Sequence, residues 1–135
     1  MSLQVRKVVT GHDAAGRAVV KLDEQVRNVR SGRANQEASV IWTTESFPVD
    51  NDGDGDANET PGTTLADGTV FRVIEYGPGV APRRHRTDSI DYAVVISGES
   101  VLTPAVSSHF FDHDPSSRPL VVSSSARRSP SSVFD

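Results

Sequence analysis

The pattern of apolar and polar positions predicts short β-strands from the start of the chain. Residues 6–10 and 17–21 are rich in valine, and the intervening stretch 11–16 contains the glycine and aspartate typical of turns. These residues therefore predict a hairpin. His12 lies within the predicted turn and is interpreted as a solvated loop residue, because nothing near it in the sequence completes a site.

Further strands follow after a polar interval. Residues 28–36 hold a single apolar β-branched residue, Val29, and are predicted to form a loop. Runs of β-branched and aromatic residues then predict strands at residues 38–44, 69–76 and 90–96. Glycine-containing turns at 77–79 and 97–99 close the last two runs. Trp42 lies in the first run and is interpreted as a core residue, with a place in a pocket wall as the alternative.

The composition changes abruptly after Ser100. Residues 100–135 contain 11 serines among 36 residues, and apolar runs are as short as 120–122. A segment with so few apolar side chains buries too little surface to offset the entropy lost on folding. The sequence therefore predicts a β-domain over residues 1–100 and an irregular or disordered serine-rich tail over residues 101–135.

Composition narrows the classes of function. The net charge of −4 and the pI near 5.5 give no broad cationic surface, so nucleic acid and anionic membranes are not expected partners, and a small-molecule substrate is. The absence of cysteine excludes disulfides and thiolate metal sites. No glycine-rich nucleotide fingerprint occurs, so neither a nicotinamide nor a flavin cofactor is implied. Without a signal peptide or a long apolar run, a cytoplasmic location is predicted.

An acidic stretch at residues 50–59 resembles the opening of a calcium-binding loop. The matching positions are Asp50, Asp52, Asp54 and Gly55. The bidentate glutamate needed at the twelfth position is replaced by Pro61, and the flanks lack helical periodicity. A solvated acidic loop is therefore favoured over a calcium site.

The informative motif lies between Gly79 and Gly98. Its spacing is Gly, five residues, His85, one residue, Thr87, three residues, Asp91, six residues and Gly. This spacing resembles the first motif of the cupin family, in which a second histidine occupies the place of Thr87 and a glutamate that of Asp91. Alternate residues share one face of a strand, so such a pair points into the barrel, while the glycines form the adjoining turns.

The resemblance implies that His85 and Asp91 are both metal ligands and catalytic residues. A divalent transition metal such as iron, manganese, nickel or zinc is the implied cofactor. A neutral threonine hydroxyl is a poor ligand compared with imidazole, and aspartate is one methylene shorter than glutamate. Reduced metal affinity, or none, is therefore expected.

The second cupin motif, a Pro-x-Gly turn with a further histidine, is missing from the sequence. His109 and His113, with Asp112, are the later candidates for the site and are interpreted as solvated residues of the tail. The strands of the second motif would close half of a cupin barrel. The predicted fold is therefore all-β, a cupin-type double-sheet (jelly-roll) barrel that is incomplete at the C-terminus, and a homodimer is one way to cover the gap.

The resemblance covers roughly residues 6 to 100 and is to small single-domain cupins of fungi and bacteria. Several of these are cupin-domain oxidoreductases of secondary-metabolite biosynthesis. The implied function is an oxidoreductase acting on a small polyketide-derived or aromatic intermediate, with His85 as ligand or general base and Asp91 as its acidic partner. The flanking cations Arg83, Arg84 and Arg86 are interpreted as an exposed basic loop, with binding of an acidic substrate group as the alternative. A non-catalytic binding module and a shortened, inactive form stay open as alternative functions.

Overall fold

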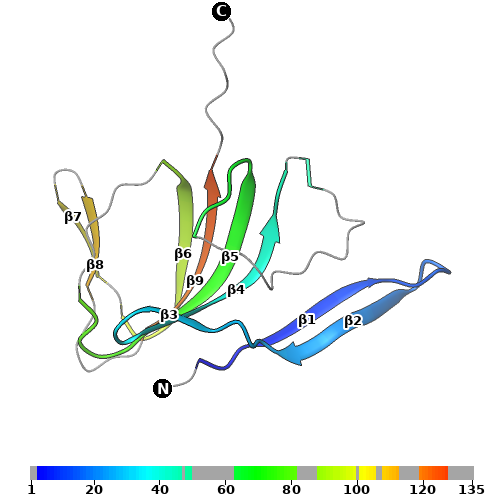
Figure 1. Ribbon diagram of the computed structural model, residues 1–135, viewed down its shortest axis with the longest axis horizontal. Coiled ribbons are helices and arrows are strands. Elements are labelled where there is room, and N and C mark those ends of the chain that lie inside the picture. The colour runs from blue at the N-terminus through cyan, green and yellow to red at the C-terminus, as the bar shows by residue number, and fades with distance from the viewer. Residues whose placement is uncertain are drawn as a thin grey trace, which may run out of the picture.

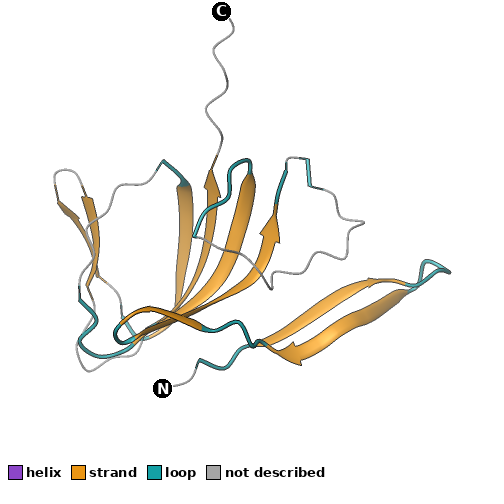
Figure 2. Cartoon of the chain, viewed as in Figure 1, coloured by secondary structure: helices purple, strands orange, loops and turns teal. Residues whose placement is uncertain are grey.

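The computed structural model describes residues 3–46, 48–49, 63–81, 88–99, 101–105, 108–112 and 119–127. The described residues form nine strands and no helix, which confirms the all-β prediction (Figures 1 and 2). The strands are β1 (Arg6–His12), β2 (Ala18–Gln25), β3 (Arg30–Arg33), β4 (Gln36–Thr44), β5 (Gly68–Tyr76), β6 (Ile90–Ser97), β7 (Val101–Ala105), β8 (Ser108–Asp112) and β9 (Leu120–Arg127).

The predicted N-terminal hairpin is present. Strands β1 and β2 pair antiparallel and extend away from the rest of the molecule (Figure 1). In the turn, Asp13 Oδ1 accepts hydrogen bonds from the backbone N–H groups of Ala15 and Arg17, both at 2.9 Å, and Gly16 has a φ of 75° that glycine adopts without strain. His12 lies at the end of β1 and is exposed.

The main sheet has five strands in the order β3-β4-β5-β9-β6, and each neighbouring pair is antiparallel. Strands β5 and β6 follow each other in the chain, yet β9 lies between them (Figure 1). Strands β7 and β8 form a separate two-stranded sheet. The prediction of a loop over 28–36 is wrong in part, because β3 pairs with β4 there despite its polar composition.

The expectation of an irregular tail beyond Ser100 is wrong for β7 and β8, which pair with each other, and also for Leu120–Arg127. This segment is β9, and both of its edges pair in the main sheet, with β5 on one side and β6 on the other. Val121 is 3% exposed and packs in the buried core. It is followed in the same strand by three consecutive serines, Ser123, Ser124 and Ser125. Strand formation depends on the neighbours that a segment pairs with, and here they outweigh the low strand preference of serine.

The core of the main sheet lies toward one end of β5. Ile74, Tyr76, Val80 and Val121 form one buried cluster, and Ala38 packs against it. Cross-strand pairing places Ala38, Ile74 and Val121 in one row, and such partners point to the same face. This cluster fixes β4, β5 and β9 relative to one another.

Polar contacts join the N-terminal segment to β4. The backbone N–H of Leu3 donates to Glu37 Oε2 at 2.5 Å, and the Lys7 ammonium lies 5.4 Å from the centre of the Trp42 ring. Lys7 is buried and Trp42 is half-buried. The indole therefore lies between strand β4 and the base of the hairpin, at the margin of the core.

Candidate functional site

Asp91 lies on β6, the strand at one edge of the main sheet. Asp91 is exposed, and the Ser89 hydroxyl donates to its Oδ1 at 3.1 Å. The serine is two residues away, so a local contact of the chain orients the carboxylate. His85, the other predicted site residue, lies outside the described residues, as do Thr87 and the cations Arg83, Arg84 and Arg86.

Cross-strand pairing shows which residues share the sheet face of Asp91. Its partner on β9 is Ser125, which in turn pairs with Val70 on β5. The adjacent row consists of Ala93, Ser123 and Arg72, and in it Arg72 Nε donates to Ser123 Oγ at 2.9 Å. Asp91 and the guanidinium of Arg72 thus belong to one face of the sheet.

Apolar residues lie on both sides of Arg72 on this face, and the row of Asp91 contains the fully buried Val70. The row after Arg72 consists of Val95, Val121 and Ile74, of which the last two are buried. A carboxylate and a guanidinium on an otherwise apolar face suit a small molecule that has both polar and apolar parts.

Sequence reasoning missed Arg72 and Ser123 as residues of this face. Arg72 alternates with Val70 and Ile74, so a charged residue in an apolar strand face was the available signal. Ser123 was missed because residues 101–135 were predicted to form an irregular tail. Their hydrogen bond joins residues 51 positions apart in the chain.

The turns predicted from the motif glycines are present. Gly79 and Gly98 both have a φ of 73°, a conformation that side chains with a Cβ rarely adopt. The backbone N–H of Val80 donates to the carbonyl of Gly77 at 3.3 Å, which closes the first turn. The motif therefore supplies its turns as its spacing predicts.

Of the other polar residues near the motif and in the tail, the structure describes Tyr92, His109 and Asp112. Tyr92 alternates with Asp91 and so points to the opposite face, where it is 69% exposed. In the separate β7–β8 sheet, His109 is paired with Pro104 and Asp112 with Val101. His113 and the acidic stretch 50–59 lie outside the described residues.

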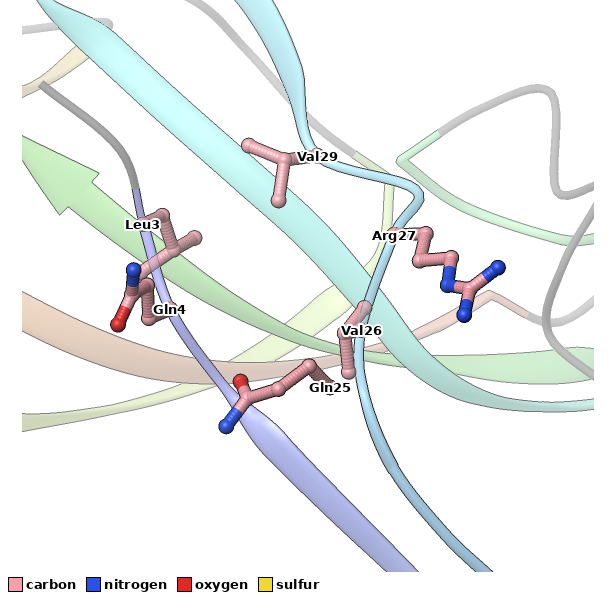
Figure 3. Close-up of a pocket in the computed structure, with 6 residues that line it drawn as sticks. All are labelled: Leu3, Gln4, Gln25, Val26, Arg27 and Val29. Atoms are coloured by element: carbon pink, nitrogen blue, oxygen red, sulfur yellow. The ribbon is translucent and has the colours of Figure 1, made fainter.

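A shallow pocket lies at the base of the hairpin. Its volume is about 480 Å³. The lining residues come from the N-terminal segment and from the end of β2 and the connection that follows: Leu3, Gln4, Gln25, Val26, Arg27 and Val29 (Figure 3). None of them belongs to β5, β6 or β9, so this pocket is a separate feature from the face that carries Asp91.

Among the described residues, the carboxylates with shifted pKa values belong to ion pairs of the hairpin. Hydrogen bonds from Arg17 lower the pKa of Asp13, and the side chain of Arg6, with Nη2 2.6 Å from Asp23 Oδ2, lowers the pKa of Asp23. These exposed pairs are features of a solvated hairpin. Across the described parts of the chain, no three His, Asp or Glu side chains gather to form a metal centre. No helix in those parts is long and apolar enough to cross a membrane.

No family model matches the chain, but individual relatives do. It is 36% identical over 100 residues to the "Cupin-domain-containing oxidoreductase fogC" of Aspergillus ruber, which is 70% of this chain and 49% of that protein. It is 35% identical over 97 residues to the "Cupin-domain-containing oxidoreductase virC" of Hypocrea virens, covering 67% and 50% of the two chains. It is 33% identical over 101 residues to "Phomopsin biosynthesis cluster protein C'" of Diaporthe leptostromiformis, covering 69% and 53%.

The chain therefore spans about half the length of the curated relatives it matches. Their names and the all-strand architecture together support the predicted jelly-roll type of fold.

Proposed function

The chain is a relative of fungal cupin-domain oxidoreductases, and from that premise we propose that it acts as one. The proposed substrate is a small polyketide-derived or aromatic intermediate of secondary-metabolite biosynthesis. The observation that carries the proposal is the sequence identity to proteins bearing that name, over about 70% of this chain. The sheet face of Asp91 supports it with a carboxylate and a guanidinium for a substrate's polar groups and with apolar side chains for its ring.

His85 and Asp91 are the proposed catalytic residues and metal ligands. The Asp91 carboxylate is exposed and would supply an oxygen donor, and the imidazole of His85, six residues earlier, would add a nitrogen donor. When bound, a divalent transition metal would supply redox and Lewis-acid chemistry. Arg72, held by Ser123, would orient an anionic or carbonyl oxygen of the substrate on the same face.

The experiment uses the purified chain and metabolite extracts from fungal cultures. We expect mass spectrometry to show an extract component that changes by two hydrogen atoms or one oxygen atom, and we expect Asp91→Asn to abolish the change. Asp88→Asn is the matched control, because Asp88 is an exposed aspartate three residues away and has no proposed role. Turnover that is equal in the wild type and Asp91→Asn would refute the proposed site.

A non-catalytic binding module is the second candidate. The replacement of the motif's second histidine by Thr87 favours it, because it removes one of the expected metal ligands. In that case an extract component would bind to the wild type and be recovered unchanged, and binding would weaken in Arg72→Ala. Unchanged recovery therefore separates the binding module from the enzyme.

A further inference from the structure

Arg72 lies in an apolar part of the main sheet. It is half-buried on β5, and its neighbours on the same face, Val70 and Ile74, are 0% and 4% exposed. Its Nε donates to the Oγ of Ser123, a buried residue of β9, at 2.9 Å. A guanidinium stays charged at every pH at which proteins are folded. Electrostatic attraction is stronger beside apolar side chains than in water, so this position favours an anionic group of a ligand.

The charges on this face indicate which anion fits. In the row of Arg72 and the two adjacent rows, the paired residues of β5, β9 and β6 include one basic residue, Arg72, and one acidic residue, Asp91. A phosphate monoester brings nearly two negative charges at pH 7, which one guanidinium does not balance and which Asp91 repels. A carboxylate brings one charge, and its two oxygens match the planar fork of an arginine. The face therefore favours a carboxylate over a phosphate.

Short side chains separate Arg72 from Asp91. Strand β9 lies between β5 and β6 (Figure 1), and Ser123 and Ala93 continue the row of Arg72 toward β6. Ala93 is exposed and lies two residues after Asp91, on the same face. With strands about 4.8 Å apart and alternate residues about 6.8 Å apart, the Cα atoms of Arg72 and Asp91 are roughly 12 Å apart. This space suits one ring that lies over Ala93, with one end at each charged residue.

We propose that the ligand of this face is a monocyclic aromatic carboxylic acid whose carboxylate binds Arg72 and whose ring lies over Ala93. The group that reacts then lies at Asp91, at the far end of the ring from the carboxylate. Ser123 is a positioning residue, because it holds the guanidinium through Nε. This assignment of the substrate rests on the proposed function, but binding of the carboxylate requires neither a metal nor turnover.

The experiment measures the binding of three aromatic acids, benzoate, phenylacetate and cinnamate, and of their amides by isothermal titration calorimetry without metal. At least one acid should bind the wild type with a Kd about tenfold to a hundredfold lower than that of its amide, because the amide lacks the charge that pairs with Arg72. Arg72→Gln should abolish this preference. Arg30→Gln, at an exposed arginine of β3, is the matched control and should leave the preference unchanged.

Ala93→Leu tests the position of the ring without changing a charge. Ala93 is exposed, so the fold accommodates a larger side chain there, and circular dichroism checks that each variant is folded. The added atoms occupy the place of the ring and should raise the Kd of the acid about tenfold or more. Val94→Leu, on the opposite face at a side chain that is 62% exposed, should leave the Kd unchanged.

Three results would overturn the carboxylate site: no acid that binds more tightly than its amide, a preference that survives Arg72→Gln, or tighter binding of phenyl phosphate than of every acid. The oxidoreductase proposal fails separately. If an acid binds in an Arg72-dependent manner but no extract component is oxidised, the carboxylate site stands and the oxidoreductase proposal fails. If Arg72→Gln converts an extract component as fast as the wild type does, in a reaction that requires Asp91, the oxidoreductase stands and the carboxylate site fails.

Discussion

Replacing Val121 by alanine tests whether the serine-rich segment 120–127 is a structural strand. Val121 is 3% exposed and packs in the cluster with Ile74, Tyr76 and Val80. The substitution removes two methyl groups, each worth about 0.8 kcal/mol of burial. The cavity left behind adds to this, so we expect a loss of about 2–3 kcal/mol. That is a large part of the roughly 5–15 kcal/mol that stabilises a typical domain.

The assay is urea unfolding followed by the fluorescence of Trp42, the single tryptophan of the chain, which lies on β4 of the same sheet. With a slope of about 2 kcal/mol per molar urea, the midpoint should fall by about 1 M. Val20→Ala makes the same change at a side chain that is 60% exposed and should shift stability by less than about 0.5 kcal/mol. Equal, small effects of Val121→Ala and Val20→Ala would refute the placement of β9 in the sheet and restore the irregular tail.

Two further predictions concern polar contacts. Asn28→Ala should destabilise the fold by about 1–3 kcal/mol in the same urea assay. It removes the amide that donates to the Val40 carbonyl at 3.0 Å and accepts from the buried Ser39 hydroxyl at 2.5 Å. Adding Ser39→Ala to Asn28→Ala should cost little more, and full additivity would contradict the shared hydrogen bond. Arg6→Ala should raise the pKa of Asp23 toward its ordinary value of 3.8 in a carboxyl NMR titration and leave the pKa of Asp13 unchanged. Because the pKa of Asp23 is lowered in the fold, the pair stabilises above that ordinary value and loses its contribution as the pH falls through the lower folded value. An Asp23 pKa that does not respond to Arg6→Ala would contradict the ion pair.

Local patterns in the sequence were sufficient to predict the hairpin, the strands at 38–44, 69–76 and 90–96, and the turns at Gly79 and Gly98. These features depend on residues close in the chain, such as valine runs and glycines with positive φ. Strand β9 could not be predicted in this way. Its serines carry little strand preference, and its place between β5 and β6 depends on pairing with segments far away in the chain.

The sequence also predicted only part of the site. The residue pattern placed Asp91 on a strand, which the structure confirms. Arg72 and Ser123 escaped notice because their 2.9 Å contact forms only when β9 enters the sheet beside β5. The joint action of His85 and Asp91 stays a prediction.

The metal content of the purified chain tests most directly whether His85 and Asp91 together hold a metal ion. Because Thr87 and Asp91 weaken the site, the purified wild type should bind about one ion of iron, manganese, nickel or zinc per chain when the metal is kept in excess, measured by elemental mass spectrometry after the free metal is separated rapidly. Both His85→Ala and Asp91→Asn should lose it, because each removes one of the two proposed ligands. Asp88→Asn, the neighbouring exposed aspartate, should retain it. A wild type without metal, or one whose metal survives both His85→Ala and Asp91→Asn, would contradict the proposed cupin site.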